Sequence, residues 1–160
     1  MEFLRLAQWD DLDTVMAMYK DALSYEGCVW DEYYPNREIL LDDFQNGGLY
    51  VYVLKNKVIG AISVINDEEL DKFKCWKIQD ERRISFARVV IAKNCLGQGY
   101  GRNMVAELLE ILRSKGYVSV QILVSPKNKS AMRVYQRLDF EFYDIAEAHG
   151  EEFYLCEKIL

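Results

Sequence analysis

The stretch of sequence that decides the fold is Leu96-Gly97-Gln98-Gly99-Tyr100-Gly101-Arg102. It follows an apolar run over 84–91 that is typical of a central strand, and it leads into a helical pattern over 102–115. Glycines let the backbone approach a ligand closely and adopt positive φ without strain. The first N–H groups of a helix have no partner within the helix, and together with the helix dipole they attract anions. The stretch therefore predicts a pyrophosphate-binding loop, with Arg102 adding charge.

The spacing of these glycines separates this loop from two common nucleotide motifs. A Walker loop needs Gly-Lys followed by Ser or Thr, and this stretch has no such sequence. The dinucleotide fingerprint G-x-G-x-x-G needs a third glycine at the position of Arg102. The stretch is instead G-x-G-x-G, so a dehydrogenase is a distant alternative.

Hydrophobic periodicity extends the prediction in both directions from the loop. The helix over 102–115 places Met104, Val105, Leu108, Leu109 and Leu112 on one side. A first helix, starting in the acidic run Asp10–Asp13, would bury Leu12, Val15, Met16, Tyr19 and Leu23. A third pattern follows Pro126 and Asn128 and has the inner face Ala131, Val134, Tyr135 and Leu138. The remaining elements are a helix over 36–44 and strands over 3–6, 49–54, 58–65, 118–124, 140–146 and 152–159.

The predicted order is β-α-α-β-β-β-α-β-α-β-β, which indicates an α/β fold with a mixed, mostly antiparallel sheet of about seven strands flanked by about four helices. The chain has 160 residues, of which 51% are hydrophobic, and no Pro/Gly/Ser-rich linker divides it. We therefore expect one domain over residues 1–160. The segment over 66–80 is polar and irregular, although Phe73 and Trp76 must pack somewhere.

Composition and charge indicate which classes of partner and which cellular compartment are expected. The formal net charge is -6 and the longest basic cluster is modest, which argues against nucleic acid as a partner. The four cysteines are widely spaced, so neither a zinc site nor a disulfide framework is expected. No signal-peptide pattern or long apolar stretch is present in the printed sequence, so we expect a cytoplasmic protein without a membrane partner.

Two motifs in order make the chain resemble the GNAT superfamily of acyl-CoA N-acyltransferases. That family carries (Arg/Gln)-x-x-G-x-(Gly/Ala) between its fourth strand and third helix, and 96–101 matches it except at Leu96. The family's second signature is an Asn, an Ala, a Tyr four residues later and a closing Gly-Phe. The corresponding residues here are Asn128, Ala131, Tyr135 and Asp139-Phe140, with Asp139 in place of the glycine.

The resemblance implies that the protein transfers an acetyl group from acetyl-CoA to an amine. It assigns to Tyr135 the protonation of the departing thiolate, and to the backbone near Val90 the polarisation of the thioester carbonyl. The residues it implies for acetyl-CoA binding are Val89, Val90, Ile91, Gly97, Gln98, Gly99, Tyr100, Gly101, Arg102, Asn128 and Ala131.

The sequence defines the residues that would bind the amine acceptor less clearly than those for acetyl-CoA. Between the first two helices lies an aromatic cluster that either lines an acceptor pocket or packs an irregular loop, namely Tyr25, Trp30, Tyr33 and Tyr34. The fourth strand offers Ser85 and Arg88 but no carboxylate, so the general base is left open among Glu26, Asp31, Glu32, Asp67 and a water relay. His149 is interpreted as a turn residue.

The expected acceptor is a small-molecule or peptide amine, and a homodimer is left open as an assembly. The alternative function is a module of the same fold that binds acyl-CoA as a sensor or structural partner without turnover. No metal site is expected.

Overall fold

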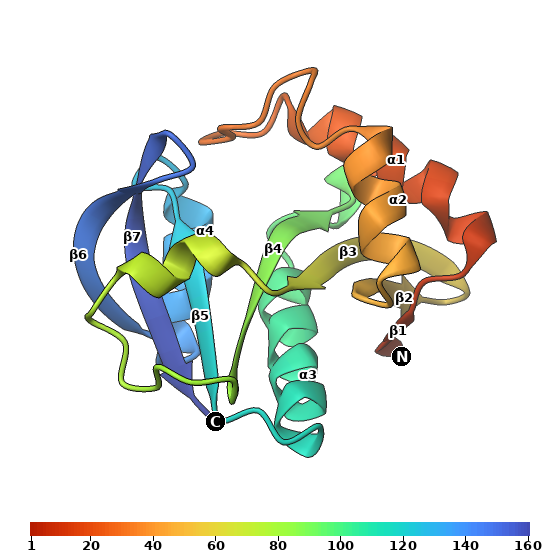
Figure 1. The fold of residues 1–160 in the computed structure, drawn as a ribbon. Coiled ribbons are helices and arrows are strands. Elements are labelled where there is room, and N and C mark those ends of the chain that lie inside the picture. The colour runs from red at the N-terminus through yellow and green to blue at the C-terminus, as the bar shows by residue number, and fades with distance from the viewer.

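The computed structural model describes residues 1–160, which form one seven-stranded sheet with helices packed against it (Figure 1). The order of the strands in the sheet is β1-β2-β3-β4-β5-β7-β6, and the predicted order of elements is confirmed. The bounds of the elements are β1 Glu2–Leu6, α1 Leu12–Ala22, α2 Arg37–Gln45, β2 Leu49–Leu54, β3 Lys57–Ile65, β4 Arg83–Ile91, α3 Tyr100–Ser114, β5 Ser119–Val124, α4 Lys129–Arg137, β6 Glu141–Ala148 and β7 Glu151–Ile159.

One pair of neighbouring strands is parallel and separates along its length. All other neighbours in the sheet are antiparallel, whereas β4 and β5 run in the same direction. They pair only at Arg83 with Ser119 and at Ile84 with Val120. Beyond these residues the strands diverge, which Figure 1 shows as a widening wedge between them.

Successive side chains of a strand point to opposite faces of the sheet, and here both faces are apolar. Helices cover each face. Leu49, Val51 and Val53 of β2 pack in one apolar cluster with α1 and α2. Tyr50 and Tyr52 of the same strand belong to the other cluster, which contains the inner residues of α3. All five residues predicted for the inner side of α3 are buried.

The predicted elements differ from the structure in a few places. α3 begins at Tyr100, within the glycine stretch, rather than at 102. Leu23 is 38% exposed, so its predicted burial is wrong: α1 ends at Ala22, and Leu23 caps the helix. The segment over 66–80 contains a 3₁₀ turn, and Trp76 packs there against Leu155.

None of the helices has the length and hydropathy required to cross a bilayer.

Candidate active site

A single continuous cavity of about 1310 Å³ lies where β4 and β5 diverge. Its lining comes from the loop after α1, the end of β3 with the residues that follow, the second half of β4, the glycine stretch with the start of α3, the end of β5, α4, and the turn between β6 and β7. These parts are separated by many residues in the sequence, and the sheet brings them to one place. The cavity is therefore the candidate binding site of this fold.

The glycine stretch forms an open backbone cradle at one end of the cavity. Gly97 and Gly99 have φ of +73° and +85°, and no atom lies within 4 Å of where a Cβ would stand on either. The first intrahelical hydrogen bond of α3 runs from Asn103 N–H to Gly99 O at 3.1 Å, so the N–H groups just before it have no partner within the helix. Arg102, Arg133 and Arg137 also line this cavity. This donor set fits a pyrophosphate.

The end of β4 forms the wall between the two halves of the cavity. In the pairing with β3, Ala87 lies opposite Ser63 and Val90 opposite Ala61, so Arg88 and Val89 form a bulge. Arg88 has φ of +54° there. A bulge re-aims the backbone of its strand. Residues 89–91 line the cavity.

Tyr135 is a core aromatic and a cavity residue at the same time. Its ring packs against Phe140 and Phe86, with centroids 5.4 and 5.8 Å away, and the side chain is 6% exposed. Burial, with a smaller effect of Cys156, raises the pKa of the phenol above its usual value. The hydroxyl therefore stays protonated at neutral pH, and Tyr135 is among the residues that line the cavity.

Asn128 and Ala131 lie at the start of α4, beside Tyr135. The side chain of Asn128 caps the helix by accepting a hydrogen bond from the Ala131 N–H at 3.1 Å. Both residues also line the cavity, so the capping does not remove them from it. Of the residues predicted for cofactor binding, only Gln98 does not line the cavity; its side chain donates to the Asn94 carbonyl at 3.2 Å.

Three of the four aromatic residues predicted for the acceptor line the same cavity, from the loop after α1. Tyr25 and Trp30 are half-buried there, and Tyr34 joins them from the more exposed end of the same loop. Trp30 also packs edge-to-face on Tyr19, with ring centroids 5.5 Å apart. Tyr33 is 73% exposed and is not part of the lining.

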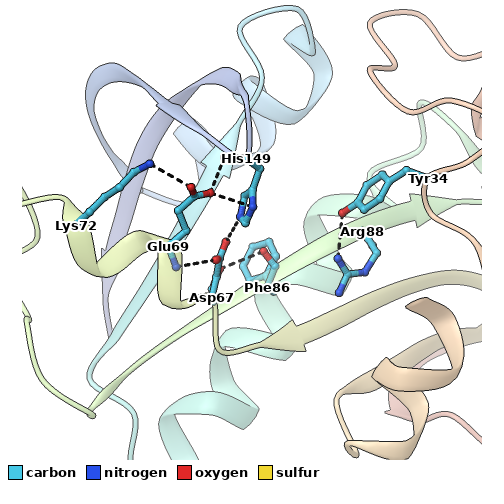
Figure 2. A network of polar contacts seen from close by, with 8 residues as sticks. Tyr34, Asp67, Glu69, Lys72, Phe86, Arg88 and His149 are labelled. Carbon is cyan, nitrogen blue, oxygen red and sulfur yellow. Dashed lines mark hydrogen bonds and ion pairs between the residues drawn. The ribbon is translucent and has the colours of Figure 1, made fainter. Parts of the chain in front are cut away.

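Three of the four carboxylates that the sequence offers as a general base also line the cavity. Glu26, Asp31 and Asp67 line the cavity, and Glu32, the fourth candidate base, does not. Asp67 is engaged: its Oδ2 lies 2.8 Å from Nε2 of His149, whose Nδ1 lies 2.9 Å from Glu69 (Figure 2). His149 is a turn residue with φ of +51°, as predicted, and it also reaches the cavity. The sequence carried no signal for this contact.

Sequence reasoning also missed the environment of Arg88. Its guanidinium makes two hydrogen bonds of 2.8 Å to Asp43 of α2, one to each carboxylate oxygen. A third nitrogen, Nη1, donates to the hydroxyl of Tyr34 at 3.0 Å, as Figure 2 shows. Arg88 lines the cavity from β4, a strand that contains no carboxylate.

Comparisons with known proteins bear on the family and on the fold. The model of the acetyltransferase (GNAT) family matches residues 14–140. The chain is 42% identical over 83 residues to a mycothiol acetyltransferase from Saccharopolyspora erythraea, a match that covers 52% of this chain and 27% of that protein. The chain thus spans about a quarter of the length of this curated relative.

Solved structures share the fold at low sequence identity. A GNAT-family acetyltransferase from Streptococcus agalactiae has a TM-score of 0.86 at 20% identity, covering 99% of this chain and 95% of that one. A phosphinothricin acetyltransferase from Sinorhizobium meliloti, solved in complex with acetyl-CoA, has a TM-score of 0.77 at 17% identity, covering 99% and 88%.

Proposed function

Because the chain belongs to the acetyltransferase (GNAT) family, we propose that it moves an acetyl group from acetyl-CoA directly to a primary amine, within a single domain over residues 1–160. One observation carries the proposal. The same cavity is lined by the glycine cradle, by Tyr135 and by aromatic residues of the loop after α1, so donor and acceptor would have adjoining places.

The donor end supports acetyl-CoA as the first substrate. Acetyl-CoA supplies an activated thioester and carries a pyrophosphate. The backbone of 97–102 and the arginines beside it suit that pyrophosphate, and Asn128 and Ala131 lie on the way to Tyr135. Residues 89–91 border the same space from β4. Gln98 takes part in this proposal through its backbone alone.

Tyr135 is proposed as the general acid. During transfer the bond from nitrogen to the acetyl carbon forms, the carbon–sulfur bond breaks, and the sulfur leaves with the electron pair. The phenol of Tyr135 gives its proton to that sulfur, and the acceptor nitrogen loses a proton to a base or to water. Burial raises the pKa of Tyr135, so the hydroxyl is protonated when the step begins and gives up its proton only as negative charge develops on the sulfur.

The acceptor end supports an amine. Tyr25, Trp30 and Tyr34 offer aromatic faces, and cations bind well over such faces. Glu26, Asp31 and Asp67 add negative charge to the lining, which attracts a protonated amine. The same three carboxylates are the remaining side-chain candidates for the base, beside a water relay.

A second candidate is an acyl-CoA-binding module without turnover. The observation that favours it is the absence of a carboxylate from β4, where the charged cavity residue is Arg88 and is already paired with Asp43. The two functions are separated by incubating the protein with acetyl-CoA and a panel of ethanolamine, putrescine, amino acids and short peptides. We expect release of free CoA that depends on one of the amines. Binding of acetyl-CoA with no amine-dependent release would favour the module.

A further inference from the structure

The side chain of Arg88 joins three elements around the acceptor end of the cavity. It extends from the bulge of β4 to Asp43 on α2 and to Tyr34 in the loop between α1 and α2. Asp43 in turn accepts a hydrogen bond of 2.6 Å from Ser63 Oγ on β3. The carboxylate is thus held from two strands.

The Arg88–Asp43 pair is well enclosed and has the geometry of a fixed support. The two side chains are 11% and 7% exposed. Two parallel hydrogen bonds between a guanidinium and a carboxylate fix the orientation of both groups. Burial by itself would lower the pKa of Arg88, but the hydrogen bonds to Asp43 raise it, so the guanidinium remains charged. Asp43 balances that charge, and the pair presents little net charge to the cavity.

The backbone at Arg88 supports the same interpretation. Its φ of +54° is in the left-handed region, which is unfavourable for a residue with a Cβ. Such a conformation persists where surrounding contacts hold it. Here the three hydrogen bonds of the side chain supply those contacts.

The contact to Tyr34 reaches the proposed acceptor. The Tyr34 oxygen accepts a hydrogen bond from Arg88, so the hydroxyl proton points elsewhere and remains able to donate. Tyr34 lines the cavity and is 40% exposed. In Figure 2 the Tyr34–Arg88 pair faces the Asp67–His149 group across the space above Phe86.

We propose that Arg88 is a positioning residue that holds the hydroxyl of Tyr34 toward the acceptor, and that this hydroxyl selects amines with an oxygen close to the amino group, such as amino-acid amides. The inference rests on the proposed function, since it concerns the acceptor of that reaction. Simple alkylamines lack the oxygen and gain nothing from the hydroxyl.

The kinetic test compares glycinamide with ethylamine as acceptors. The variants are Tyr34→Phe, which deletes only the hydroxyl, Arg88→Lys, which keeps the charge but loses the fork, and the double variant. We expect each single variant to raise the KM of glycinamide by about threefold to tenfold, the effect of one neutral hydrogen bond. The KM of ethylamine and the binding of acetyl-CoA should stay within about twofold, because neither uses that bond. The KM of glycinamide for the double variant should not exceed the higher of the two single-variant values, since both substitutions remove the same contact.

A readout that needs no turnover is hydrogen exchange of residues 25–35. Both single variants should exchange faster in this loop while α3 keeps its protection, and Tyr33→Phe, which removes an exposed hydroxyl from the same loop, should exchange as wild type does. Unchanged exchange in both variants would overturn the inference, as would losses for glycinamide and ethylamine that are equal. Wild type that releases no CoA with any amine would instead overturn the proposed function and the acceptor role with it. If wild type turns over and the variants have the same KM for glycinamide as wild type, only the inference is overturned and the proposed function stands.

Discussion

The hydroxyl of Tyr25 donates a hydrogen bond of 2.7 Å to the carbonyl oxygen of Ile91, 66 positions later in the chain. This bond fastens the loop after α1 to the last residue of β4. Because Tyr25 and Ile91 both line the cavity, this bond ties two parts of its wall together. A direct transfer between two bound molecules requires such a constraint, since small displacements of the reacting atoms slow the reaction strongly.

Replacement of Tyr135 by Phe tests the general acid. The change deletes the hydroxyl and leaves the ring packed against Phe86 and Phe140. We expect the single-turnover rate to fall by about 10²–10⁴-fold, while acetyl-CoA affinity and Tm stay near wild type. Tyr143→Phe is the control, because its hydroxyl donates to Glu157 and lies outside the cavity lining. A Tyr135→Phe protein with the wild-type rate would return the residue to a packing role.

Replacement of Gly101 by Val tests the donor cradle. A Cβ on Gly101 would meet only Ile91 Cγ1, at 3.7 Å, so the free protein should fold. The added methyl groups would occupy the space beside the unpaired N–H groups of α3. Wild type at 100-fold excess of acetyl-CoA over Kd should gain about 2.7 kcal/mol in unfolding free energy, and the variant should gain almost none. Ala106→Val, on the same helix but away from the cavity, should keep the gain. Equal thermal shifts in all three proteins would remove the loop from the proposed site.

Replacement of Trp30 by Ala tests the acceptor loop, with Tyr33→Ala as the matched control. Trp30 lines the cavity, whereas Tyr33 projects into solvent from the same loop. We expect Trp30→Ala to raise the KM of the acceptor more than that of acetyl-CoA, because an aromatic contact to the amine is lost. Steady-state kinetics with the best amine of the panel measures both values. If Tyr33→Ala has the same effect, the loop acts through its overall fold and not through this side chain.

Replacement of Glu157 by Gln tests a buried carboxylate that the proposed reaction does not use. Glu157 is 2% exposed and accepts hydrogen bonds from Lys77 N–H, Ser119 and Tyr143 at 2.7–2.8 Å. Burial alone would raise the pKa of this group, but these hydrogen bonds lower it below the usual 4.5. Its stabilisation is therefore complete above pH 4.5 and is lost as the pH falls through the lower pKa of the folded state.

Urea unfolding of this variant should show the corresponding pH dependence. At pH 7 we expect Glu157→Gln to lower the unfolding free energy by about 1–3 kcal/mol, since donors are left poorly matched. The difference from wild type should shrink as the pH is taken below 4.5. Glu141→Gln, at an exposed ion pair with Lys77, should cost far less at either pH. A difference that does not change with pH would mean that the charge of Glu157 contributes nothing.

Much of the fold was readable because its signals are local. The inner face of α3 follows a helical period, and all five predicted residues are buried. The predicted end of α1 was wrong at Leu23 because the helix stops one residue earlier, and an apolar period does not mark where a helix ends. The sequence also left open whether Tyr135 is a core residue or a cavity residue. Its spacing placed it on an inner face, and only the tertiary packing against Phe86 and Phe140 showed that it also borders the cavity.

The sequence by itself determined the order of elements, the open glycine loop at the start of α3 and the spacing of Asn128, Ala131 and Tyr135. Each of these depends on residues a few positions apart. The tertiary structure decided which distant side chains meet. The pairing of β4 with β3 through a bulge directs Arg88 to Asp43 and Tyr34, which lie 45 and 54 positions away. The hairpin between β6 and β7 brings His149 to Asp67 across 82 positions. Such contacts leave no period or motif in the sequence, because strand register and the divergence of β4 from β5 create them.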